Sequence, residues 1–233
     1  MSLYLWINLL SVSVPFIVSF HPRLQLHKQW QWLFPAIVIS MIPYIVWDVY
    51  FTEQGYWGFN PTYLLGAYFL SLPLEEWLFF VCIPYACVFT HYSLKELFPK
   101  MKIPERSAKK LADVLLVVYI VLLPIFYNKA YTRIDLLFGI VVLIWARFSA
   151  IQLLRRFFLT FLFMLIPFFV VNGVLTGTGI DDQIVWYNDD QNLGIRLGTI
   201  PVEDSLYAFS LLLLNLLLFE KIKSVATRKK GLT

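Results

Sequence analysis

Charged side chains are scarce in this chain of 233 residues. Asp, Glu, Lys and Arg make up 15% of it, whereas hydrophobic residues make up 59%. Soluble domains carry about 25% charged residues, and disordered segments carry few aromatic ones. Aromatic residues account for 18% here. The composition therefore excludes a soluble domain and a disordered chain, and it predicts an integral membrane protein.

Cysteine and histidine are also rare. The two cysteines, Cys82 and Cys87, lie in one apolar stretch, and the three histidines show no ligand spacing. A disulfide framework is therefore not expected, and no metal site is predicted. The chain has neither a glycine-rich dinucleotide motif nor a phosphate-binding loop, so the sequence predicts no flavin or nucleotide domain.

Apolar stretches long enough to cross a bilayer as helices recur along the chain. They lie at about 3–20, 32–51, 74–92, 111–127, 134–151, 157–175 and 201–219. No basic segment precedes the first stretch and no small-residue cleavage pattern follows it, so it predicts a membrane helix rather than a signal peptide. We therefore expect an all-α integral membrane protein with about seven transmembrane helices.

The basic residues predict the orientation of these helices. Of the 19 Lys and Arg residues, 16 fall on one side of a seven-helix arrangement, and the other three are Lys129, Arg133 and Arg196. The side rich in Lys and Arg is usually cytoplasmic. We expect a multi-pass protein of the cell membrane with its N-terminus outside and its C-terminus in the cytoplasm. The basic segment 227–230 fits this topology signal, so no nucleic-acid partner is predicted.

An internal repeat relates the two ends of the chain. IPYIVWD (42–48) matches IPFFVVN (166–172) at an offset of 124, and PLEEWLFF (73–80) matches PVEDSLYAF (201–209) at an offset of 128. The four extra residues are expected in an outer loop. One linker helix between two three-helix units makes the units parallel, a 3+1+3 arrangement. The first repeat, with the PLEE motif, is expected at 1–95, and the basic loop with the linker helix at 96–130. The second repeat, with the PVED motif, is expected at 131–220, and a basic tail at 221–233.

Ionisable residues are few within the predicted helices, and they gather near the outer ends. Such residues are costly in a bilayer and commonly functional. A proline followed by acidic residues is also typical of a helix start, so that explanation stays open for each motif. A site is favoured because the segment 62–72 is apolar and because each motif carries two acids. The candidate catalytic residues are Glu75, Glu76, Glu203 and Asp204, with Asp48 and Asn172 at a similar depth.

Paired carboxyl groups and aromatic rings suit one kind of chemistry. Adjacent carboxylates repel each other at low dielectric, so one of them should keep its proton and lie as an acid beside a base. Aromatic faces can stabilise a cation, although for each ring alone membrane packing is the more common explanation. The combination predicts protonation of a carbon–carbon double bond and control of a carbocation. The candidate aromatic residues are Trp47, Tyr50, Trp77, Phe79, Phe80, Tyr207 and Phe209.

The segments PLEEWLFFVCIPY (73–85) and IPVEDSLYAFSLLLLNLLLFE (200–220) resemble the membrane lycopene β-cyclases. These are flavin-independent enzymes that occur as two subunits, as one fused chain, or within fungal fusion proteins. The resemblance covers nearly the whole chain. It implies that linear ψ end groups of lycopene and related carotenoids are cyclised to β-ionone rings, through γ-carotene to β-carotene, in carotenoid biosynthesis. It also implies no consumed cofactor, and catalysis by the four acids of the two motifs.

Two other functions are compatible with seven helices. A small transporter of the SWEET type also has parallel three-helix repeats, but those proteins carry a Pro-Gln motif that is absent here. A retinal receptor needs a lysine in its last helix, and 201–219 contains none.

Because parallel repeats place both acidic motifs near one leaflet, we expect a single composite site between the repeats. The sequence does not indicate an oligomeric state.

Overall fold

The computed structural model describes residues 2–230, and most of them are helical. The predicted all-α class is confirmed, and each predicted apolar stretch overlaps one helix. Met1 and the last three residues of the predicted basic tail, 231–233, lie outside the described residues. The helices are α1 (Leu3–Val18), α2 (Trp30–Glu53), α3 (Leu74–Leu97), α4 (Glu105–Ile125), α5 (Ala130–Ser149), α6 (Ile151–Leu175) and α7 (Val202–Lys230).

Several of these helices have the length and composition of membrane spans. Within residues 2–230, four are long and apolar enough to cross a membrane: α2 with the single 3₁₀ turn before it (Leu26–Gln29), α3, α6 and most of α7. Helix α1 is apolar but shorter. Helices α4 and α5 carry several charged side chains, including Asp113 in α4 and Asp135 in α5. The structure is therefore that of a membrane protein.

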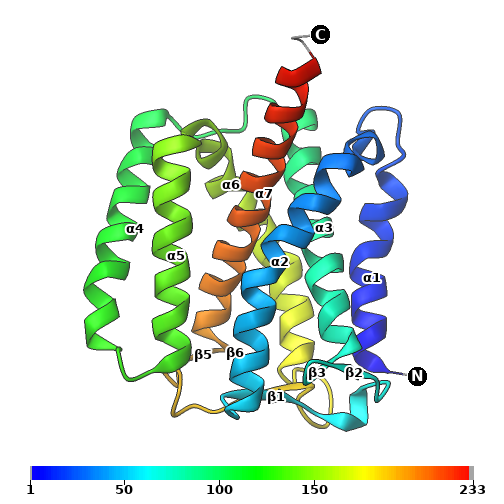
Figure 1. Ribbon diagram of the computed structural model, residues 1–233, viewed down its shortest axis with the longest axis vertical. Helices are drawn as coiled ribbons and strands as arrows, with labels where there is room; N and C mark the ends of the chain where they lie inside the picture. The colour runs from blue at the N-terminus through cyan, green and yellow to red at the C-terminus, as the bar shows by residue number, and fades with distance from the viewer. Residues whose placement is uncertain (1, 231–233) are drawn as a thin grey trace.

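Within residues 2–230, six short strands lie at the end of the bundle where α1 begins, and α7 ends at the opposite end (Figure 1). They form three antiparallel pairs. Two of the pairs are tight hairpins that lead directly into α3 and α7. The pairs are β1 (Trp57–Phe59) with β4 (Val185–Tyr187), β2 (Tyr68–Phe69) with β3 (Leu72–Pro73), and β5 (Arg196–Leu197) with β6 (Ile200–Pro201).

The strands follow the internal repeat residue by residue. Adding 128 to the numbers of β1, β2 and β3 gives β4, β5 and β6. In the β1–β4 pair, Gly58 lies opposite Trp186, which is its own repeat equivalent. Equivalent segments can pair in this self-complementary way only about a two-fold axis. The two halves of the bundle are thus related by an approximate axis that passes through this residue pair.

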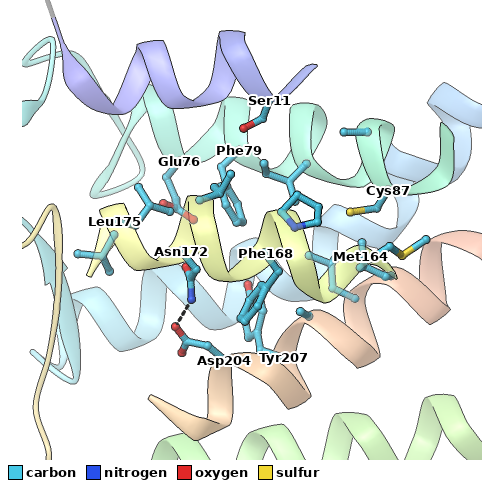
Figure 2. Close-up of a pocket in the computed structure, with 18 of the residues that line it drawn as sticks. Ser11, Glu76, Phe79, Cys87, Met164, Phe168, Asn172, Leu175, Asp204 and Tyr207 are labelled. Atoms are coloured by element: carbon cyan, nitrogen blue, oxygen red, sulfur yellow. Dashed lines mark hydrogen bonds between the residues drawn. The ribbon is translucent and has the colours of Figure 1, made fainter. Parts of the chain in front are cut away.

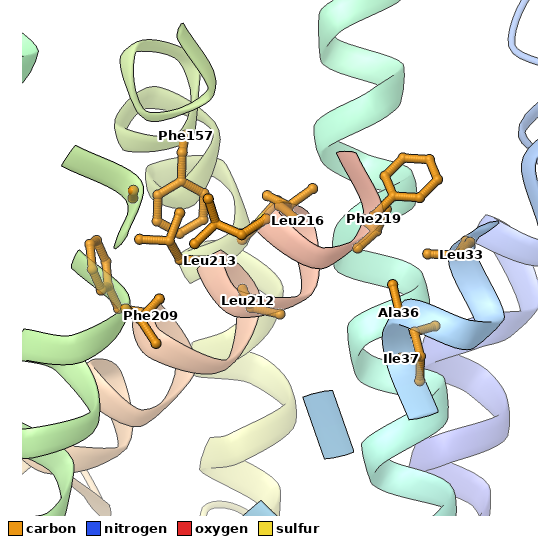
Figure 3. Close-up of a cluster of buried hydrophobic side chains, with 14 of the residues drawn as sticks. Leu33, Ala36, Ile37, Phe157, Phe209, Leu212, Leu213, Leu216 and Phe219 are labelled. Atoms are coloured by element: carbon orange, nitrogen blue, oxygen red, sulfur yellow. The ribbon is translucent and has the colours of Figure 1, made fainter. Parts of the chain in front are cut away.

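Helix α7 lies at the centre of the bundle and carries much of the apolar core. Figure 3 shows Leu212, Leu213 and Leu216 of α7 between Phe157 of α6 and the N-terminal part of α2. Burying such side chains against one another fixes the helices around α7, because protein interiors pack at crystal-like density. The core fills the half of the bundle away from the strands, and it leaves the acidic motifs at the strand end.

Candidate active site

A cavity of about 330 Å³ lies between the two halves of the chain. Helices α1, α3 and α6 form its long walls, α7 closes one side, and β1 and β4 lie at its outer end. Four of the six predicted polar residues, two from each half, line this outer end: Asp48, Glu76, Asn172 and Asp204 (Figure 2). The rest of the lining is mostly apolar. The cavity therefore has the composite character that the repeat predicts.

Asp204 is surrounded by hydrogen-bond donors. Tyr131 Oη donates to Oδ1 at 2.6 Å, while Asn172 Nδ2 and Tyr187 Oη donate to Oδ2 at 2.6 Å and 3.0 Å. All three donors, Tyr131, Asn172 and Tyr187, also line the cavity. Three donors that converge on a buried carboxyl group stabilise its charged form. Asp204 thus lies at the cavity wall with three hydrogen-bond donors around its carboxyl group.

Glu76 has a different environment at the equivalent position. It accepts one hydrogen bond, from Tyr4 Oη, and its carboxyl group lies within hydrogen-bond reach of that of Asp48. Asp48 accepts from Trp57 Nε1 at 2.6 Å and from Thr52 Oγ1 at 3.4 Å. Two buried carboxyl groups that lie close together favour a state in which one of them keeps its proton, because two negative charges repel strongly there.

Two substitutions between the repeats account for this difference: Asp48 in place of Asn172, and Phe59, which has no hydroxyl group, in place of Tyr187. Tyr4 holds Glu76 as Tyr131 holds Asp204, so the tyrosine and the acid are present in both halves. Position 48 is aspartate, whereas its equivalent, 172, is asparagine. The amide donates a hydrogen bond that favours a carboxylate, and the carboxyl group in its place favours a shared proton. A nearly symmetric frame therefore places one acid beside a second carboxyl group and the other beside an amide.

The first acid of each motif faces away from the cavity. Glu75 Oε1 accepts a hydrogen bond from the backbone N–H of Leu65 at 2.7 Å, and Glu203 Oε1 accepts one from that of Leu193 at 2.8 Å. Thr132 Oγ1 adds a further hydrogen bond to Glu203, at 2.6 Å. In each half the acid binds the residue ten positions before it, at the start of the hairpin that leads into its helix. These two carboxylates hold the outer loops.

Two of the seven predicted aromatic residues, Phe79 and Tyr207, line the cavity. The structure places the other five elsewhere. Trp47 and Phe80 are buried in a cluster around Tyr44. The other three are Trp77, whose Nε1 donates to Phe69 O, Tyr50, which is 53% exposed, and Phe209, which belongs to the core around α7.

Sequence reasoning missed several aromatic residues at the outer end of the cavity. Tyr4 and Tyr131 belong to a weaker part of the repeat, YLWIN (4–8) and YTRID (131–135), which aligns at an offset of 127. That pattern could have identified both tyrosines. Trp57 and Tyr187 lie on β1 and β4 and line the cavity because those strands pair. No local pattern in the sequence predicts that pairing.

Asp135 was also missed, although it lies within a predicted span. It is fully buried, and neither carboxyl oxygen has a hydrogen-bond partner. Its repeat equivalent is Asn8, whose Nδ2 donates to the backbone oxygen of Glu75 at 2.8 Å. Asp135 does not line the cavity, so its position marks a helix contact inherited from the repeat rather than a further group of the site.

Comparison with known proteins gives one match. Residues 1–94 and 128–222 match the family described as Lycopene cyclase. No curated protein and no solved structure matches the chain. The two matched regions are the two halves related by the repeat, and the region between them contains α4. Because the match covers most of the chain and both acidic motifs, this membrane protein belongs to the lycopene cyclase family, enzymes of carotenoid biosynthesis.

Proposed function

We propose that this enzyme closes β-ionone rings at the ψ ends of lycopene by acid–base catalysis, without net oxidation or reduction. The observation that supports this most directly is the pair of unlike acids in one apolar cavity. The Glu76–Asp48 pair can donate a proton, and the Asp204 carboxylate can accept one. Ring closure needs both operations on the same end group.

In the first step, the proton shared by Glu76 and Asp48 passes to C2 of the ψ end. The C1=C2 double bond supplies the electron pair for the new C–H bond, and C1 becomes a tertiary carbocation. The C5=C6 double bond then attacks C1, which forms the C1–C6 bond and moves the positive charge to C5. A positioned general acid contributes about 10²–10⁴-fold to such a step.

In the second step, Asp204 removes the proton from C6. The electrons of that C–H bond form the C5=C6 double bond of the β ring, and the positive charge is neutralised. One proton has been added and one removed, so the product is an isomer of the substrate. Tyr207 and Phe79 offer their ring faces to the cavity, where they can stabilise the intermediate cations.

The arrangement in the membrane is part of the proposal. We place seven helices across the bilayer as two parallel three-helix repeats joined by α4, with the N-terminus outside. The opposite positions of the two termini support an odd number of crossings (Figure 1). The gathering of all six described strands at the end with the N-terminus supports parallel repeats. No observation favours a transporter.

Pigment colour tests the function. Lycopene-producing bacteria that express the chain should change from pink-red to orange or yellow, and extracts should contain γ-carotene or β-carotene. The purified protein should perform the same conversion without added flavin or nicotinamide. Unchanged lycopene beside an active control cyclase, or strict dependence on reduced flavin, would contradict the proposal.

Isotope incorporation tests the separate acid and base. In D₂O, each new ring should carry one deuterium at C2, because the proton removed by Asp204 is not the one donated by the Glu76–Asp48 pair. Mass spectrometry of the product measures this. Rings formed without deuterium would mean that one carboxyl group takes the C6 proton in one turnover and donates it to C2 in the next, without exchange with solvent.

A further inference from the structure

The cavity is a long slot rather than a round pocket. On α3 its lining runs from Glu76 through Phe79, Ile83 and Ala86 to Thr90, a regular spacing that follows one face of the helix. At 1.5 Å per residue, this stripe is about 21 Å long. The slot therefore extends from the acids at the outer end toward the other side of the bundle.

The two ends of the slot differ in how they are covered. At the acid end the lining residues Tyr4 and Trp57 are buried. Farther along, Ser11 and Pro15 of α1 are half-buried and Pro167 of α6 is exposed. In Figure 2, side chains of α3 are seen between Ser11 on α1 and α6. The slot is closed over its acids and opens sideways between α1 and α6.

The surfaces beside this opening are apolar. Leu10 and Val14 of α1 and Ile166 and Val170 of α6 are all between 63% and 66% exposed. Exposed side chains of this kind within a membrane-spanning bundle face the lipid. The opening between α1 and α6 therefore leads into the hydrocarbon layer and not into water.

The repeat provides an equivalent groove, along α7 and between α5 and α2, but it is filled. There Trp47 lies 5.2 Å from Phe138 and 5.0 Å from Tyr207, centroid to centroid, and Tyr44 lies 5.0 Å from Phe138. Tyr44 Oη also donates to Ser210 Oγ at 2.8 Å, which ties α2 to α7. Of the two grooves, the one along α3 is the one left open.

We propose that the polyene chain of the substrate lies in this slot along α3, and that its far end projects between α1 and α6 into the bilayer. This proposal rests on the proposed function. Lycopene is about as long as the hydrocarbon core, roughly 30 Å, so the slot holds about two thirds of it. The substrate enters sideways from the lipid with one end first, and the slot does not contact the other end. Acyclic and monocyclic carotenoids are therefore accepted alike through their ψ ends.

Two serines of α1 provide a matched test. Ser11 lines the slot, whereas Ser13 does not, and both donate to a backbone oxygen of the preceding turn. In lipid nanodiscs, Ser11→Trp should lower kcat/KM for lycopene at least about tenfold, because the indole occupies the space of the polyene. Ser13→Trp should remain within about twofold of the unsubstituted enzyme, since this side chain lies outside the slot. Equal rates for the two variants would overturn the proposal.

Binding gives a second readout that does not depend on turnover. A Glu76→Gln protein, which should not consume its substrate, is loaded with lycopene, and bound pigment per protein is measured after size-exclusion chromatography. Adding Ser11→Trp should remove the bound lycopene, whereas adding Ser13→Trp should not. Ala86→Phe, on the opposite wall, replaces Ser11→Trp if that variant elutes as an aggregate. Retention of lycopene by both blocking variants would contradict the slot.

The outcomes also separate this proposal from the proposed function. One outcome is that the Glu76→Gln protein binds lycopene, that adding Ser11→Trp removes this binding, and that the unsubstituted enzyme forms no ring. In that case the slot is correct and the function is wrong. If the unsubstituted enzyme and Ser11→Trp both form rings at the same rate, the function is correct and the slot is wrong.

Discussion

Neighbouring acids in one helix have separate tasks in this protein. Successive helix residues point about 100° apart, and only the second acid of each motif, Glu76 or Asp204, lines the cavity. The sequence places all four at the right depth, but it does not tell which member of each pair is inside. That distinction depends on loop backbone that only the folded chain brings to Glu75 and Glu203.

Substitutions in the two motifs should therefore have two kinds of effect. Glu76→Gln and Asp204→Asn should lower kcat by about 10²-fold or more with little change in the melting temperature. Glu75→Gln and Glu203→Gln should lower the melting temperature, because each weakens a charged hydrogen bond to an outer loop, while the folded fraction keeps most of its activity. Rates per folded protein and thermal unfolding in detergent measure both. A loss of kcat without a loss of stability in Glu75→Gln would assign that residue to the chemistry instead.

Asp135 gives a prediction of the opposite sign. A buried carboxyl group without partners is costly, and the repeat equivalent of this position is the amide Asn8, which binds a backbone oxygen. Asp135→Asn should therefore raise the melting temperature and leave ring formation unchanged. Asn8→Asp, the reverse exchange in the other half, should lower the melting temperature. Loss of activity in Asp135→Asn at normal stability would mean that Asp135 takes part in proton transfer.

At the scale of helices and strands, the sequence predicts long apolar segments well and short strands not at all. Each predicted span corresponds to a helix because hydrophobic length is a local property. The pairing of β1 with β4 joins residues about 128 positions apart, and strands of three residues have no periodicity to read. The sequence does predict that the length difference between the repeats lies in an outer loop. In the structure, nine residues separate α6 from β4 and three separate α2 from β1.

The β1–β4 pair should tolerate little change at its centre. A Cβ atom at Gly58 would lie 2.4 Å from the Trp186 ring, which is far inside van der Waals contact. Gly58→Ala should therefore cost about 1–3 kcal/mol of stability, measured by thermal unfolding. Trp186→Leu should restore much of it in the double variant, because the smaller side chain leaves room for the methyl group. If the double variant were no more stable than Gly58→Ala alone, the strain would have another source.

At the scale of the whole molecule, the repeat predicts a composite cavity between the halves, and the structure has one. What the repeat cannot predict is that only one of two equivalent grooves is open. That difference arises from a few large side chains, such as Trp47 and Phe138, whose packing depends on neighbours from several helices. A site residue can therefore be found from the repeat, whereas the shape of the space around it cannot.

The orientation of the molecule can be checked by cysteine labelling. In intact cells, Asp181→Cys should react with a membrane-impermeant maleimide, because this exposed residue lies in the loop between α6 and β4 on the side of the N-terminus. Lys102→Cys, in the exposed loop between α3 and α4, should react only after the cells are opened. The native cysteines lie within α3 and serve as the background. The reverse pattern would invert the topology.

The paired strands over the acid end also bear on which product the enzyme releases. A tertiary carbocation that meets water is trapped within its first encounters and ends as an alcohol. Trp57 on β1 and Val185 on β4 are both buried and line the cavity at this end, so they keep bulk water from the cation at C5. In the proposed mechanism, removal of the C6 proton by Asp204 then precedes addition of water, and the ring leaves as a hydrocarbon. A loosened strand pair, as in Gly58→Ala, should reveal itself by traces of hydroxylated carotenoid beside the normal ring.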